Sequence, residues 1–170
     1  MFNEMAVVLL MMTGLRVGEL CDLKLRDLPT CHGKPQIRVR DGKGRVSRSV
    51  QVHPFVIEKL AGYIAAVRKG ARDGSLLFVT ERGGQYDPDY LRSKMEIICK
   101  KLGFKKLHPH MLRHTYLTDA WNSTLDLRFV QDQAGHKNIN TTAIYTRTSD
   151  DKRTEHVSSL RIVKIAQELP

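Results

Sequence analysis

The chain has 170 residues, 41% of them hydrophobic, and its 28 Lys and Arg against 18 Asp and Glu give a net charge of +10. This size and composition fit one soluble globular domain with a real core. We expect neither a membrane span, because no apolar run is long enough, nor a secretory signal at the N-terminus. The positive charge favours a polyanionic partner such as nucleic acid.

The three cysteines are odd in number and far apart, and the sequence contains no CxxC. This pattern argues against a disulfide framework and against a zinc site built from cysteines. It fits a reducing compartment, so we expect a cytoplasmic protein.

The N-terminal third predicts two helices and a hairpin. Residues 2–12 are apolar and helix-prone, and residues 16–23 place apolar side chains on one face of a second, short helix. Residues 36–40 and 46–52 alternate polar and apolar side chains, as half-buried strands do. The Asp-Gly-Lys-Gly segment between them is a strong tight-turn signal, so we predict a β-hairpin with Lys43 at its tip.

The remainder of the chain predicts helices. Prolines favour helix starts, and Gly135 is a plausible helix C-cap. A final amphipathic helix is expected near the C-terminus, after a short helix that carries Tyr145. The fold class is therefore mainly α with a small antiparallel β-sheet (α+β). The predicted helices cover residues 54–68, 88–102, 109–121, 127–134, a turn or two from 140 or 141, and 150–169.

Five polar residues stand out from this framework. Arginine binds phosphate oxygens in a bidentate way, histidine can donate or shuttle a proton, and a phenol held beside them can act as a nucleophile. In a basic chain, this combination points to covalent chemistry on a DNA phosphodiester. The five are Arg16, His110, Arg113, His136 and Tyr145.

Each candidate also has an ordinary structural explanation. Arg16 could be a surface cation paired with Glu19, and His136 could be stabilised by a helix dipole. Tyr145 could be a core or interface aromatic, and Lys43 could be a solvated charge on a turn.

A metal site is another possible explanation for the histidines. His110 and His114 are four residues apart on a predicted helix, which is the spacing of two zinc ligands. The HExxH pattern fails because Met111 follows His110, and only His108 and Asp119 could supply a third ligand. We therefore expect no metal and interpret His114 as a packing residue.

The order and spacing of these motifs resemble the catalytic domain of the tyrosine recombinase (phage integrase) family. The resemblance covers nearly the whole chain, and it is specific because the pieces occur jointly and in order. The matching pieces are Thr13–Leu20, Gly42-Lys43-Gly44, His110-x-x-Arg113-His114-Thr115, Gly135-His136, and Tyr145 nine positions after His136.

The resemblance implies how the phosphate would be held. Arg16 and Arg113 would clamp the scissile phosphate, with Glu19 as the acidic residue that supports the site. Lys43 would enter the minor groove and help to protonate the leaving 5′ oxygen. Two positions depart from the family pattern: Val46 stands where a second basic residue is common, with Arg45 beside it, and Ala134 stands in place of a leucine.

The resemblance also implies the chemistry. His110 and His136 would be the two histidines of the site, and Tyr145 would form a 3′-phosphotyrosine link to DNA. Neither a metal nor a nucleotide cofactor is required, because the phosphotyrosine bond retains the energy of the broken linkage. Family members act on double-stranded DNA as tetramers on paired sites. We expect residues 1–170 to be a single catalytic domain, with the family's N-terminal core-binding domain absent from this chain.

The sequence thus predicts a site-specific recombinase or integrase. Two alternatives stay open: a DNA-binding module or recombinase remnant without catalysis, and a type IB topoisomerase that relaxes supercoils. Covalent attachment of Tyr145 to nicked DNA separates the first alternative from a recombinase. Relaxation without recombination partners would favour the second.

Overall fold

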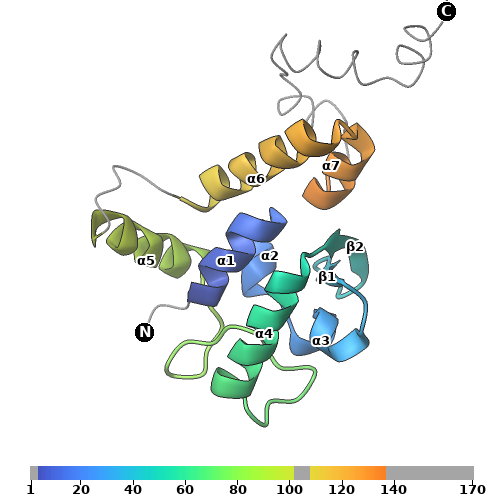
Figure 1. The fold of residues 1–170 in the computed structure, drawn as a ribbon. Coiled ribbons are helices and arrows are strands. Elements are labelled where there is room, and N and C mark those ends of the chain that lie inside the picture. The colour runs from blue at the N-terminus through green and yellow to red at the C-terminus, as the bar shows by residue number, and fades with distance from the viewer. Residues whose placement is uncertain (1–3, 102–107, 137–170) are drawn as a thin grey trace, which may run out of the picture.

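The computed structural model describes residues 4–101 and 108–136, which form a mostly helical unit with one two-stranded antiparallel sheet (Figure 1). This architecture confirms the predicted fold class. The elements in chain order are α1 (Glu4–Thr13), α2 (Val17–Cys21), the 3-10 helix η1 (Leu25–Asp27), α3 (Pro29–His32), β1 (Gln36–Arg40), β2 (Val46–Gln51), α4 (Pro54–Val67), α5 (Pro88–Lys101), α6 (Pro109–Thr124) and α7 (Leu127–Ala134).

Proline and glycine mark the helix ends that the sequence predicts. Pro54 and Pro109 lie in the first turns of α4 and α6, where a missing N–H costs no hydrogen bond. The Asp126 side chain caps α7 by accepting from the Phe129 backbone N–H at 2.9 Å. Gly135 ends α7 with φ at +65°, a left-handed conformation that glycine adopts without strain.

The structure differs from the prediction in three places. Helix α2 ends at Cys21 and not at residue 23, because Asp22 is its C-cap and the chain is extended by Lys24, which forms an isolated β-bridge with Leu76. The short helices η1 and α3 were missed, although Pro29 and the left-handed Gly33 bracket α3. Helix α6 runs on to Thr124, three residues beyond its predicted end. The predicted helices around Tyr145 and over 150–169 lie outside the described residues.

The main core joins the helices to the sheet, and a smaller core lies between α6 and α7. Helix α1 packs against α4 and α6, and α7 packs against α6 and β2 (Figure 1). The turn after α1 meets α6 very closely: a Cβ atom on Gly14 would lie 2.6 Å from the Tyr116 ring. The fold therefore brings together three segments that are distant in the sequence: the segment before α2, the hairpin and the end of α7.

None of the helices within the described ranges has both the length and the apolar composition needed to cross a membrane.

Candidate functional site

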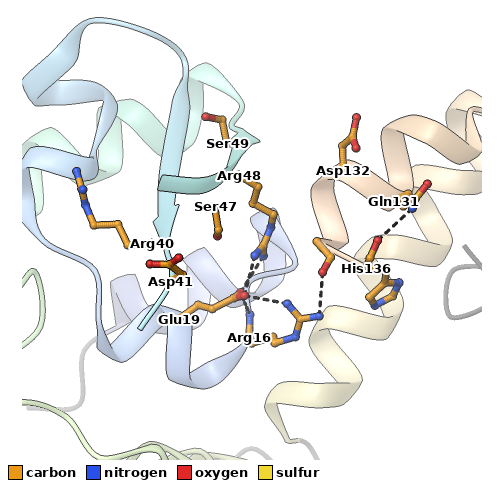
Figure 2. Close-up of a pocket in the computed structure, with 11 residues that line it drawn as sticks. Arg16, Glu19, Arg40, Asp41, Ser47, Arg48, Ser49, Gln131, Asp132 and His136 are labelled. Atoms are coloured by element: carbon orange, nitrogen blue, oxygen red, sulfur yellow. Dashed lines mark hydrogen bonds and ion pairs between the residues drawn. The ribbon is translucent and has the colours of Figure 1, made fainter. Parts of the chain in front are cut away.

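A pocket of about 680 Å³ lies where the start of α2, the hairpin and the end of α7 meet (Figure 2). Of the six predicted site residues that the structure describes, three line it, namely Arg16, Glu19 and His136. Two further arginines, Arg40 and Arg48, also line it. Three carboxylates, those of Glu19, Asp41 and Asp132, line it as well, so an anion could bind there only next to the guanidinium groups.

Arg16 precedes the first turn of α2 and is held there by Glu19. Its backbone N–H donates to the Glu19 carboxylate at 2.7 Å, and its Nη1 donates to the same carboxylate at 2.9 Å. Nη2 approaches the Gly135 carbonyl at 3.4 Å. The Arg16 side chain stays 44% exposed, so it can still reach a ligand in the pocket.

Glu19 lies between two arginines, as Figure 2 shows. Arg48 donates to both of its oxygens, at 2.7 Å from Nη1 and 2.8 Å from Nη2. Burial alone would raise the pKa of Glu19, but the hydrogen bond and charge of Arg48, with hydrogen bonds from Arg16, lower it to about 2. The carboxylate is therefore ionised at any working pH.

Arg113 is buried on α6 and joins the two ends of the described chain. Its Nη1 donates to the Gly14 carbonyl, and its Nη2 donates to the Ala134 carbonyl at 2.8 Å. The same Nη2 lies 3.1 Å from Nε2 of His136. Arg113 and Arg16 thus donate to neighbouring carbonyls of the turn that carries His136.

The surroundings of His136 favour the uncharged form of its imidazole ring. Burial and the charges of Arg113, Arg16 and Arg48 all lower its pKa. Its backbone carbonyl accepts from Gln131 Nε2 at 3.1 Å, which closes the end of α7. A neutral imidazole beside two guanidinium groups can hydrogen-bond to a bound phosphate or take a proton.

Arg48 was missed by the sequence reasoning, although a signal was present. It pairs across the sheet with buried Val39 and shares its strand face with Val50, which is fully buried. A cation on the apolar face of a strand must have a buried partner. Here that partner is Glu19.

The hairpin has the predicted form, with Lys43 at its exposed tip. The Asp41 carboxylate accepts from the backbone N–H groups of Lys43 and Arg45, both at 3.0 Å. Arg40 connects the turn to the core, since its side chain donates to the carboxylate of buried Asp27 at 2.6 Å and to the Gly44 carbonyl at 2.7 Å. Lys43 itself does not line the pocket.

His110 lies in the first turn of α6, where its side chain is exposed, and it does not line the pocket either. Tyr145 lies outside the described residues. Within residues 4–97 and 108–136, no group of three His, Cys, Asp or Glu side chains could hold a metal ion. The structure therefore brings together Arg16, Glu19, Arg113 and His136, whereas Lys43 and His110 do not line the pocket.

The sequence of the chain matches known proteins over nearly all its length. Residues 1–152 match the Phage integrase family. The chain belongs to this family. The tyrosine recombinase XerC of Bacillus licheniformis is 36% identical over 155 residues, which is 88% of this chain and 50% of that protein. The tyrosine recombinase XerA of Pyrococcus furiosus is 32% identical over 165 residues, or 95% of this chain and 56% of that protein.

Solved structures of integrase-family proteins have the same fold. The crystal structure of XerA recombinase matches with a TM-score of 0.76 at 35% identity, over 92% of this chain and 57% of that one. XerH recombinase bound to its difH substrate matches with a TM-score of 0.70 at 28% identity, over 91% and 45%. The chain spans about half the length of the curated relatives it matches.

Proposed function

We propose that this integrase-family chain is the catalytic domain of a site-specific recombinase, which cleaves and rejoins DNA strands through a 3′-phosphotyrosine intermediate. The observation that carries the proposal is the meeting of Arg16, Arg113 and His136 at one turn beside an arginine-lined pocket. A DNA phosphate placed there would receive donors from both sides. That residues 1–170 form a single catalytic domain stays a prediction.

The proposed reaction follows from the charges at such a phosphate. The Tyr145 oxygen attacks phosphorus, the bond to the 5′ oxygen breaks, and the phosphate becomes esterified to the tyrosine. Arg16 and Arg113 stabilise the negative charge that develops on the non-bridging oxygens, and each donor contributes about a few kcal/mol in sites of this kind.

Two protons move in this step. The Lys43 ammonium gives one to the leaving 5′ oxygen, which would otherwise depart as an alkoxide. The phenolic proton passes to an imidazole, either that of His110 or that of His136; His136 can accept it at Nε2 only by giving up its contact with Arg113. In the rejoining step a 5′ hydroxyl attacks the phosphotyrosine, and both proton transfers run in reverse, so no cofactor is consumed.

The proposed partner is double-stranded DNA. The charge of +10 supports it, and two of the similar structures, XerH with its difH substrate and the Tn1549 integrase with circular intermediate DNA, are complexes with DNA. We further propose that the protein acts in the cytoplasm and self-associates on DNA, as a tetramer on paired sites.

Trapping of a covalent adduct tests the proposal. The chain is incubated with nicked suicide substrates that carry candidate sites, and adducts are resolved on a denaturing gel. We expect an adduct with the wild-type chain and none with Tyr145→Phe, which keeps the ring but loses the nucleophilic oxygen. Tyr116→Phe is the matched control, because burial raises the pKa of Tyr116 and its ring packs against Gly14.

The two alternatives give different results. A DNA-binding module without catalysis would shift DNA on a native gel and form no adduct with any substrate. A type IB topoisomerase would relax supercoiled plasmid without a paired site. An adduct that persists in Tyr145→Phe would assign the nucleophile to another residue.

A further inference from the structure

Arg48 has no part in the proposed chemistry, yet it lines the pocket. Its side chain is only 12% exposed, and each of its three nitrogen atoms already donates to a protein acceptor. Nη1 and Nη2 bind Glu19, and Nε lies 3.3 Å from the Gln133 carbonyl. Three of its five N–H groups are thus engaged by the protein, and burial makes its guanidinium group less accessible to a phosphate than that of Arg16, which is 44% exposed.

The acceptors of Arg48 belong to the two sides of the site: Glu19 lies in α2, as Figure 2 shows, and Gln133 lies in α7. Glu19 holds the backbone and the guanidinium group of Arg16. Gln133 lies at the end of α7, immediately before the turn that receives Arg16 and Arg113 and carries His136. One guanidinium group thus connects both sides.

Packing as well as hydrogen bonding joins Arg48 to this turn. A Cβ atom on Gly135 would lie 2.7 Å from both Cδ and Nη1 of Arg48. A side chain there would displace the Arg48 guanidinium group, and the left-handed backbone, with φ at +65°, favours glycine independently. The stem of Arg48 sets how closely β2 approaches the His136 turn.

Loss of Arg48 would leave Glu19 with Arg16 as its main remaining cation. The carboxylate would then compete with the substrate phosphate for the Arg16 donors. With Arg48 in place, both carboxylate oxygens are bound from the sheet side, and Arg16 shares only part of their charge.

We propose that Arg48 is a positioning residue, which fixes Arg16 through Glu19 and fixes the Gly135–His136 turn through the Gln133 carbonyl. It keeps the two sides of the pocket at the separation that a single phosphate requires. This inference rests on the proposed function and deepens it. It assigns to the hairpin a second task, separate from that of Lys43 at its tip.

The test compares two scissile linkages in single-turnover cleavage. One is the ordinary phosphodiester, and the other is a methylphosphonate, in which a methyl group replaces one non-bridging oxygen and removes its negative charge. Arg16→Ala calibrates the assay, because a donor to the missing oxygen matters less on the neutral linkage. Arg48→Gln is the test variant, and Arg92→Gln, which removes an exposed cation of α5 with an ion-pair partner in Asp89, is the control.

We expect Arg48→Gln to slow cleavage of the phosphodiester by about tenfold or more. On the methylphosphonate the loss should shrink to less than about threefold, in parallel with Arg16→Ala. In the double variant Arg16→Ala/Arg48→Gln, the combined loss of cleavage rate should be smaller than the product of the two single losses. Both changes act on the same contact, that between Arg16 and the phosphate. Arg92→Gln should cleave both linkages as the wild type does.

A purely structural role gives a different pattern. It would slow both linkages by the same factor, and the losses in the double variant would multiply; that result overturns the proposal. If Arg48→Gln does not fold, Arg48→Lys serves instead, since one ammonium cannot bind both Glu19 oxygens and the Gln133 carbonyl in the same way. Wild-type rates in a folded Arg48 variant overturn this inference alone. A wild-type chain that forms no adduct overturns the proposed function, and this inference with it.

Discussion

The Nη2 atom of Arg113 lies 3.1 Å from Nε2 of His136. A guanidinium group can only donate, so Nε2 must accept and the imidazole carries its proton on Nδ1. This one relationship fixes both the charge and the tautomer of His136. Burial of the ring is the main reason why the pKa of His136 is lowered, and the contact with Arg113 adds to it, because a protonated ring would place like charges together; Arg16 and Arg48 contribute in the same direction.

Cleavage should lose rate at acid pH through protonation of His136. Because the pKa of His136 is lowered, the neutral ring persists below the ordinary value of 6.5, and the midpoint of the acid limb should lie below that value. The measurement is the single-turnover cleavage rate as a function of pH. In His136→Gln the rate should be lower and the limb attributed to His136 should vanish, since glutamine does not titrate; an unchanged limb would assign it to another group.

Glu19 should contribute stability that disappears in acid. Its pKa is lowered from 4.5 to about 2 in the folded chain, so the stabilisation is fully present above pH 4.5 and is lost as the pH falls towards 2. Glu19→Gln should therefore lower the free energy of unfolding at neutral pH and flatten its decline between these values. Chemical denaturation at several pH values measures both effects.

Glu58→Gln is the control for this experiment, because Glu58 is an exposed residue of α4. It should retain the wild-type pH dependence. Equal slopes for wild type and Glu19→Gln between pH 4.5 and 2 would contradict the role given to Glu19 in stability.

Gly14→Ala should destabilise the fold more than Gly33→Ala. Both glycines have positive φ, at +64° and +73°, so each substitution carries a backbone cost of about 1 kcal/mol. Only Gly14 meets a neighbour, since its Cβ would lie 2.6 Å from the Tyr116 ring, whereas nothing lies within 4 Å at Gly33. The difference between the melting temperatures of the two variants measures the cost of the contact. Equal decreases in melting temperature would show that the Tyr116 ring on α6 can move aside at little cost.

Binding of the chain to DNA of arbitrary sequence should be weak and steeply dependent on salt. If about five phosphates are neutralised, the slope of log affinity against log salt concentration should be about −4 to −5. Fluorescence anisotropy with a labelled duplex measures it. Tight binding to arbitrary duplex that does not respond to salt would contradict an electrostatic interface.

The parts of the site that sequence reasoning found are those with local signals. Arg16 and Glu19 are three residues apart at a helix start, and the hairpin follows from its two-glycine turn and alternating strands. The role of Arg48 was not predictable in this way, because its partner Glu19 is 29 residues distant and the Gln133 carbonyl is 85 residues distant. Those pairings depend on tertiary packing.

The missed 3-10 helix η1 has the same explanation, whereas α3 does have local signals in Pro29 and Gly33. The segment before them is fixed by backbone bonds to a remote strand-like stretch, with Leu25 N–H donating to the Ser75 carbonyl at 3.0 Å and Leu77 N–H donating to the Leu23 carbonyl at 2.7 Å. A window of neighbouring residues contains no information about such partners. Tyr145 lies outside the described residues, and its role stays a prediction.

The bond from Arg113 to the Gly14 carbonyl joins residues 99 positions apart in the chain. During synthesis, the ribosome releases the α1–α2 turn long before α6 exists, so a nascent chain holds Arg16 without its counterpart. The anion pocket can close only after α7 and its terminal turn have emerged. A truncated translation product that stops before α6 therefore carries Arg16 and Glu19 but lacks Arg113 and His136, with which they form the proposed phosphate site.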